Sequence, residues 1–157
     1  IPGRLRGCGV ARPVRVASVD GVALDGPSVM DCSAAKALKK WLGRGVKPAI
    51  GQLGGGVKSL TVIDSYSCRT RNNQPGAKIS EHGRGRAVDI AAINLNNGLS
   101  LNVDKDWDAR AKGKLLHRIH DSACGPFGTV LGPGSDRFHD DHIHVDTARH
   151  RGGAYCR

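Results

Sequence analysis

SEHGRGRAVDI, residues 80–90, joins a glycine-containing turn to an apolar run that continues to residue 93. The run AVDIAAI predicts a strand, and the alternation of side chains along a strand puts Ala87, Asp89 and Ala91 on one face. The intervening valine and isoleucine then face the core. Two interpretations compete for His82 and Asp89: one half of a metal site, or an ordinary turn leading into a strand whose polar residues face water.

A second histidine-rich stretch, FHDDHIHVD, lies at residues 138–146. A strand period of two directs His142, His144 and Asp146 to one face and leaves the apolar residues between them for the core. Polar alternation on a half-exposed strand can produce HxH without any metal. Three histidines and three aspartates within nine residues, together with the upstream histidine and aspartate, instead predict a catalytic zinc site with three protein ligands and one open position.

Length and composition favour one domain over residues 1–157. With 22 glycines and only 4% aromatic residues, we expect short elements joined by tight turns and an aliphatic core. Apolar residues at helical spacing predict a helix over 33–45, which Ser33 begins and Gly43 ends, and a second over 106–123, which Asp106 begins. Further strands are expected at 14–24, 57–63 and 127–131.

The five cysteines are widely spaced, at Cys8, Cys32, Cys68, Cys124 and Cys156, with no CxxC pair. This spacing favours disulfides over a zinc knuckle or a redox motif, and an odd number leaves at least one thiol unpaired within the chain. Which cysteines pair is not evident from the spacing. Disulfides persist in oxidising compartments, so we expect a periplasmic or secreted protein.

The formal net charge of +10 predicts anionic partners, among them nucleic acid, anionic lipid and acidic cell-wall polymers. No aromatic stacking platform or recognition helix is evident, so we expect no specific nucleic-acid partner. No stretch approaches the roughly 20 apolar residues that cross a bilayer, so no transmembrane segment is expected. We expect the chain to be a monomer.

SEHGRGRAVD has the form SxHxxGxAxD, and DHIHVD supplies HxH. Together these motifs resemble the LAS group of zinc peptidases, which contains lysostaphin-type endopeptidases, D-Ala-D-Ala carboxypeptidases and murein endopeptidases and has the hedgehog domain as a relative. Over nearly the whole chain, the stretches SYSCRTRNNQPGA, FGTVLGPGSD and YCR also resemble the bacterial extensin-like C-terminal domain family.

The resemblance to the LAS group implies an α+β fold, with a small antiparallel sheet that carries the zinc site and is flanked by helices. It implies that His82, Asp89 and His144 bind zinc and that His142 is a catalytic group beside it. The implied activity is zinc-dependent hydrolysis of an amide bond in peptidoglycan stem peptides or crosslinks. The relationship to hedgehog leaves a second possibility, a non-catalytic zinc module that binds wall peptide or a protein.

Carboxypeptidases of the LAS group carry ExxH, and this chain has Asp141 at the position of that glutamate. Asp141 is therefore a candidate general base with a shorter arm. In the alternative, Asp140, Asp141 and Asp146 orient the imidazoles. His139 is a candidate contact to the substrate or transition state.

Ser80 and Arg69, which both precede His82 in the sequence, are candidate substrate-binding groups. Ser80 lies beside the metal in the family pattern, although its hydroxyl can equally cap a turn. Arg69 is favoured over Arg71 as a clamp for an anionic group, with a solvated loop charge as the alternative. The sequence does not determine whether the cleaved bond is of the D-D or the L-D type, or whether the activity is that of an endopeptidase or a carboxypeptidase. It also leaves open which residue is the general base and which metal is bound physiologically.

Overall fold

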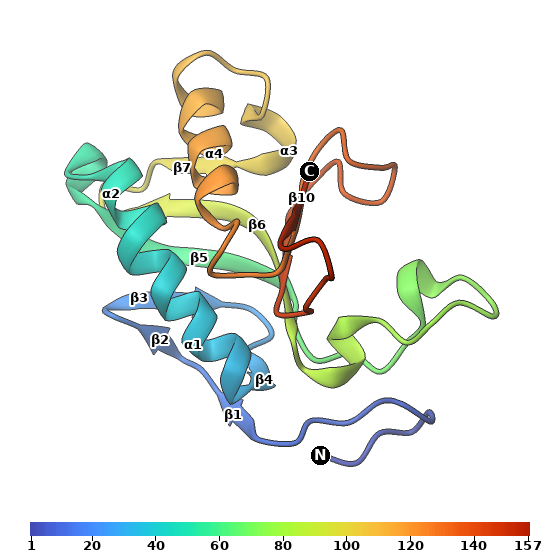
Figure 1. The fold of residues 1–157 in the computed structure, drawn as a ribbon. Helices are drawn as coiled ribbons and strands as arrows, with labels where there is room; N and C mark the ends of the chain where they lie inside the picture. The colour runs from blue at the N-terminus through green and yellow to red at the C-terminus, as the bar shows by residue number, and fades with distance from the viewer.

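A long mixed sheet runs through the centre of the protein, as the computed structural model of residues 1–157 shows (Figure 1). From edge to edge its strands follow the order β10-β8-β9-β6-β5-β3-β2, and β7 pairs with β6. β1 and β4 form a separate antiparallel pair. The strands are β1 (Pro13–Arg15), β2 (Ser18–Val19), β3 (Val22–Asp25), β4 (Val29–Asp31), β5 (Val57–Asp64), β6 (Ala87–Leu95), β7 (Ser100–Asn102), β8 (Thr129–Leu131), β9 (Ile143–Asp146) and β10 (Tyr155–Cys156).

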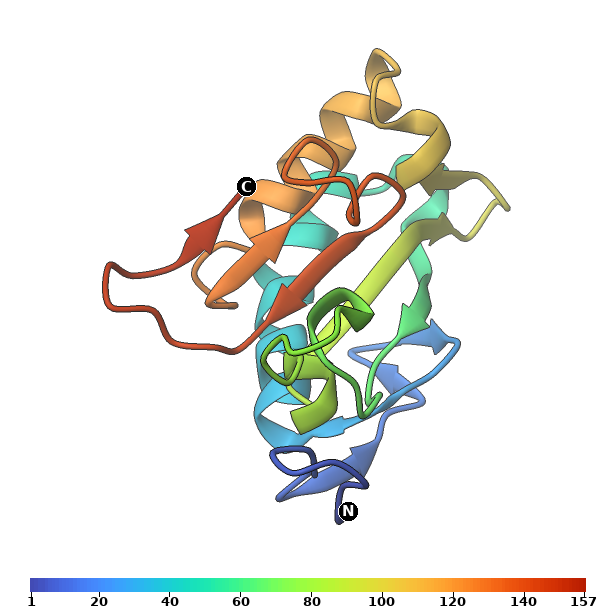
Figure 2. The same ribbon diagram turned by 90° about the vertical axis from the view of Figure 1, so that its right-hand side faces the viewer.

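The helices cover one face of the sheet and the long loops lie on the other (Figures 1 and 2). The helical segments are α1 (Cys32–Trp41), the π-helical η1 (Leu42–Val46), α2 (Lys47–Ile50), the 3-10 turns η2 (Leu53–Gly55), η3 (Arg71–Asn73) and η4 (Glu81–Arg84), α3 (Val103–Asp106) and α4 (Ala111–Ser122). The α+β class is therefore confirmed.

The expectation of an antiparallel sheet holds for the central strands, because β6 runs antiparallel to β5, β7 and β9. It is wrong at two places, where β3 pairs with β5 and β10 pairs with β8 in parallel. Parallel neighbours need a crossover connection, which for β3 and β5 contains α1. The alternation of apolar residues does not distinguish the two directions, and the sheet is larger than expected.

Alternation along β6 and β9 separates the core from the opposite face. Val88 and Ile90 of β6, and Ile143 and Val145 of β9, are fully buried in a hydrophobic cluster shared with α1 and α4. The prediction for this face is confirmed. Farther along β6 the alternation shifts, because the residues of β5 that pair with Ile90 and Ala92 are consecutive and leave Ala91 as a bulge.

The first helix begins one residue earlier than expected, because Asp31 caps it. The Asp31 carboxylate accepts hydrogen bonds from the amide and hydroxyl of Ser33 at 2.9 and 2.6 Å. Gly43 does not end it, since the helix continues through η1 and α2 to Gly51, where φ is 57°. α4 lies so close to Gly45 that a Cβ there would overlap Ser122, so the absence of a side chain at Gly45 allows α4 to pack against this helix.

The second predicted helix, 106–123, is helical only as α4 (Ala111–Ser122), and Asp106 does not begin it but belongs to the preceding short helix α3. Asn102 caps α3 by accepting the amide of Lys105 at 3.0 Å. Asp106 lies at the end of α3, and its carboxylate accepts the amide of Asn102 at 2.8 Å. Leu116 and Ile119 of α4 are buried in the core.

Two disulfides connect segments that are distant in the sequence. Cys8 pairs with Cys68 and Cys124 pairs with Cys156, while Cys32 is free. The first bridge ties the N-terminal segment to the loop after β5, and the second ties β10 to the loop before β8. Two bridges fit an extracellular or secreted protein. None of the helices has the length and apolar content needed to cross a membrane.

Breaking either disulfide is expected to lower the free energy of unfolding by roughly 2–5 kcal/mol, because the bridges close loops of 60 and 32 residues in the unfolded chain. Chemical denaturation of Cys124→Ser/Cys156→Ser against the parent measures the effect. Cys32→Ser is the matched control and should change stability by less. Thiol titration of the denatured, unreduced protein should find one thiol per chain, and five would contradict the pairing.

Candidate metal centre

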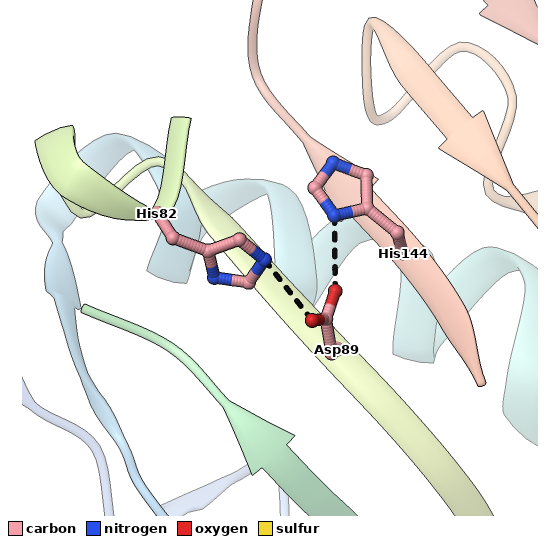
Figure 3. A group of neighbouring side chains, drawn as sticks. All are labelled: His82, Asp89 and His144. Carbon is pink, nitrogen blue, oxygen red and sulfur yellow. Dashed lines mark hydrogen bonds and ion pairs between the residues drawn. The ribbon is translucent and has the colours of Figure 1, made fainter. Parts of the chain in front are cut away.

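Three side chains from separate elements converge on the face of the sheet opposite the helices (Figure 3). His82 belongs to η4, Asp89 to β6 and His144 to β9. Asp89 and His144 are direct cross-strand partners in the β6–β9 pairing, so the sheet itself aligns them. One ligand atom from each of the three residues lies within 4.8 Å of the others, and all three residues are buried. The structure thus brings together the predicted metal ligands.

The His82 ring is held in an orientation that leaves one nitrogen without a partner. Its Nδ1 lies 2.7 Å from the carbonyl oxygen of Ser65 and must donate, because a carbonyl only accepts. In the neutral ring Nε2 is then an acceptor, yet it is buried, has no hydrogen-bond partner and faces Asp89 Oδ2 at 3.1 Å. Two acceptors face each other here, and a cation between them, either a proton or a metal ion, would satisfy both.

The His144 ring lies between two carboxylates. Its Nδ1 is 2.9 Å from Asp89 Oδ1 and its Nε2 is 2.7 Å from Asp146 Oδ2. Burial opposes the charged ring, but the hydrogen bonds and negative charges of Asp146 and Asp89 outweigh it and raise the pKa of His144 to about 9. Burial likewise opposes ionisation of Asp89, yet His144 and His82 hold the pKa of that carboxyl far below its usual value.

Asp146 therefore lies where the orienting role considered from the sequence would require it. By accepting the Nε2 proton of His144 it leaves Nδ1 directed at Asp89. A carboxylate or carbonyl behind each ligating imidazole is the usual arrangement around protein-bound metals. His82 has the Ser65 carbonyl and His144 has Asp146. Asp140 is exposed and forms no comparable contact with the three ligands.

The turn before β6 explains the glycines of the first motif. Ser80 Oγ accepts the amide of His82 at 3.2 Å, so the hydroxyl caps η4, and Ser80 is buried at the cavity wall. Gly85 ends the turn with φ of 69°, a left-handed conformation that favours glycine. A Cβ on Gly83 would crowd Ile79 and the sulfur of Cys8. Both glycines therefore fix the position of His82.

His142 is buried beside the three ligands, immediately before β9. Its Nε2 lies 3.6 Å from Asp89 Oδ2, and its Nδ1 lies 2.7 Å from Asp141 Oδ1. The Asp141 side chain is 66% exposed and lies outside the cavity that the histidines line. Asp141 is thus placed to orient the imidazole of His142.

His139 joins the same group of rings, which the sequence spacing alone did not establish. Its ring centroid lies 5.1 Å from that of His142 and 5.6 Å from that of His144. Its Nδ1 is 2.6 Å from Asp136 Oδ1. Burial lowers the pKa of His139, with the neighbouring histidines adding to the effect, although Asp136 opposes it. The ring therefore favours its neutral form.

The three proposed ligands line a cavity of about 650 Å³. Arg69 and Arg71 both line it, but their environments differ. The Arg69 guanidinium is 3.0 Å from Asp64 Oδ2, whereas Arg71 forms no salt bridge. The preference for Arg69 as an anion clamp is therefore weakened, because its charge is already partly balanced, and Arg71 is the uncompensated cation.

Sequence reasoning missed three contributors to the site: the Ser65 carbonyl, Asp64 and Asp136. Asp64 is the last residue of β5 and lies 3.6 Å from His82 Nδ1. Its place directly after the strand expected at 57–63 was the available signal. Asp136 stands three residues before His139 in the turn GPGSD, a spacing at which a side chain can reach back. A backbone carbonyl leaves no trace in the sequence.

Two imidazoles and one carboxylate are the donor set of many catalytic zinc sites, which keep a further position open. The unpartnered nitrogen of His82 and the oriented nitrogen of His144 fit such an ion. The residues therefore suit a divalent metal with nitrogen and oxygen preference. His142 stands beside the ligand set and not within it.

Comparison with known proteins adds one finding. No curated protein and no solved structure has significant similarity to the chain. The chain does match the family model described as "Extensin-like protein C-terminus", over residues 2–157. The match includes both histidine motifs and all four cysteines of the disulfides. The chain therefore belongs to the extensin-like protein C-terminus family.

Proposed function

We propose that the protein is a zinc-dependent hydrolase of an amide bond in peptidoglycan stem peptides or crosslinks. The observation that carries this proposal is the buried, partnerless Nε2 of His82, which lies beside Asp89 and His144 in the lining of an open cavity. The similarity of SxHxxGxAxD and HxH to the LAS zinc peptidases supports the same ligand set. The two disulfides support a location in the cell envelope.

A zinc ion at this position would supply Lewis acidity toward an amide carbonyl and toward water. The chain supplies proton transfer through His142. Because Asp141 accepts the Nδ1 proton of that ring, Nε2 is free to take a proton from the attacking water and deliver it to the departing amine. His142 is thus the proposed catalytic residue, and Asp141 a positioning residue.

Other groups in the cavity are suited to bind the substrate. His139 is held by Asp136 with its ring against His142, so its remaining nitrogen is available to a polar group of the peptide. Arg71 offers a positive charge to a substrate carboxylate. Ser80 keeps its hydroxyl on the amide of His82, so its contribution is to hold that ligand in place.

Digestion of defined muropeptides, followed by mass spectrometry, tests the proposal. The zinc-loaded protein is expected to release peptide fragments from a crosslinked muropeptide, and a chelator is expected to stop the reaction. Stoichiometric zinc without any cleavage would instead favour the non-catalytic zinc module. Absence of a stoichiometric divalent ion, with no uptake of added zinc, would rule out both.

Zinc affinity is expected to rise about tenfold per pH unit from neutral pH to about pH 9. The reason is that His144 carries an extra proton below its raised pKa, and zinc must displace that proton from Nδ1. Competition with a chelator of known pH dependence measures the effect. An affinity that is constant over this range would contradict the proposed displacement.

The stability of the metal-free protein should change in the opposite direction. Because folding raises the pKa of His144, its ion pairs with Asp89 and Asp146 stabilise the metal-free fold fully below pH about 6.5, the ordinary histidine value. This contribution is lost as the pH rises through about 9. Thermal unfolding of zinc-free and zinc-loaded protein should therefore diverge most on the alkaline side.

A further inference from the structure

A second cavity, of about 1040 Å³, adjoins the metal site. Ala148 and His150 line both cavities and form a wall that the two share. This shared wall is tied to the metal site, because Asp146 Oδ1 accepts the amide of Ala148 at 2.9 Å. His150 Nε2 lies 2.8 Å from Thr129 Oγ1. Ala148 and His150 both belong to the loop between β9 and β10, which is drawn in red in Figure 2.

The second cavity is strongly cationic, and we call it the basic groove. It is lined by Arg12, Lys36, Lys40, Arg86 and Arg149. Its single acidic residue is Asp31, which caps α1 and accepts hydrogen bonds from the amides of Arg12 and Ser33 and from the Ser33 hydroxyl. Apart from Arg12, which lies 3.7 Å from Asp31, none of these cations forms a salt bridge. The groove therefore has a large uncompensated positive charge.

Helix α1 contributes two of these charges from a single face. Lys36 and Lys40 are one turn apart and exposed. Like charges at this spacing destabilise a helix, and neither lysine has an acidic neighbour to offset the repulsion. An anion bound in the groove would remove that repulsion. This arrangement favours a binding surface over an ordinary solvated helix face.

The groove contains no exposed Phe, Tyr or Trp ring, since Phe127 is fully buried and the one exposed ring is the imidazole of His150. The groove therefore lacks the series of large aromatic rings on which successive nucleic-acid bases stack. The disulfides also fit an extracellular location. Because the groove borders the metal cavity at Ala148 and His150, a polymer whose bond lies at the metal would reach the groove by passing over the loop that holds these two residues.

We propose that the basic groove binds a carboxylate-bearing peptide strand that continues beyond the bond at the metal. This inference rests on the proposed function and deepens it, because a strand on both sides of the reacting bond is a crosslink and not a chain end. The predicted preference is for crosslinked peptide over an uncrosslinked stem. Lys36, Lys40, Arg86 and Arg149 are the residues that would pair with its carboxylates.

Binding can be measured without turnover in the full chain carrying His142→Ala, which keeps all three proposed zinc ligands. The probes are a fluorescently labelled crosslinked muropeptide dimer and the corresponding uncrosslinked stem peptide. Lys36→Gln/Lys40→Gln is expected to weaken dimer binding about threefold to tenfold, the effect of losing two exposed ion pairs. It should leave stem-peptide binding unchanged. The loss should diminish at high salt.

Lys114→Gln/Arg118→Gln is the matched control. These residues are exposed, one turn apart on α4, and line neither cavity. Equal weakening by both double variants, or unchanged dimer binding in the α1 variant, would overturn the proposal. So would an equal loss for the stem peptide, or displacement of the dimer by a short DNA duplex at lower concentration than unlabelled dimer. If the groove result holds but the parent protein cleaves nothing, the hydrolase proposal alone fails.

Discussion

His82→Ala is expected to abolish stoichiometric zinc binding and, with it, hydrolysis of muropeptide. The substitution removes the nitrogen that faces Asp89 without a partner, and it leaves two protein ligands in place of three. Loss of a residue behind a ligand typically lowers metal affinity 10–100-fold, so loss of the ligand itself should exceed about 100-fold. Metal analysis and chelator competition measure the change. Asp89→Ala and His144→Ala should behave alike.

His117→Ala provides the control, because His117 is exposed on α4 and lies outside both cavities. It should retain zinc at the parent level. Circular dichroism separates loss of the ligand from loss of the fold. A folded His82→Ala protein that still holds one zinc ion per chain would contradict the assignment of this centre.

His142→Ala is expected to retain zinc while losing about 10²–10⁴-fold in rate, mainly in kcat. The three ligands remain, but the nitrogen proposed to transfer the proton is gone. Asp141→Asn should cost less, because its exposed carboxylate contacts the far nitrogen of the ring. Metal content and muropeptide cleavage, measured on the same preparations, test both expectations.

Two outcomes would contradict this assignment. If His142→Ala is isolated without metal, His142 is a ligand; if it cleaves at the parent rate, His142 has no catalytic part. If instead Asp141→Asn loses most activity and His142→Ala keeps it, Asp141 is the base despite its place outside the cavity. The two substitutions therefore distinguish proton transfer from orientation.

The sequence alone determined which residues of the two motifs face the metal site. On a strand, side chains alternate between the two faces, so the apolar neighbours of Asp89 and His144 already predicted that these two polar residues leave the core together. The structure agrees, with Val88 and Val145 buried on the helix side. The density of histidine and aspartate then pointed to a metal.

Helix boundaries were less predictable because tertiary contacts override local signals. Gly43 has the residue type that often ends a helix, yet the chain remains helical to Ile50. Within this helical stretch, Gly45 has no side chain and therefore allows α4 to approach closely. Asp106 has the residue type that often begins a helix, but it is the last residue of the short helix α3. The bulge at Ala91 likewise depends on pairing with β5, which has no local signature.

Only the tertiary structure decided which partner each cysteine, charged group and imidazole ring contacts. It paired Cys8 with Cys68, balanced Arg69 with Asp64, and placed His139 against His142. It also brought residues of α1 and of the loop after β9 into one basic groove. These contacts join residues far apart in the chain, and their energies depend on distance and burial in the folded protein. The periodicity of apolar residues shows which face of a strand or helix is buried, but it does not show which element packs against that face.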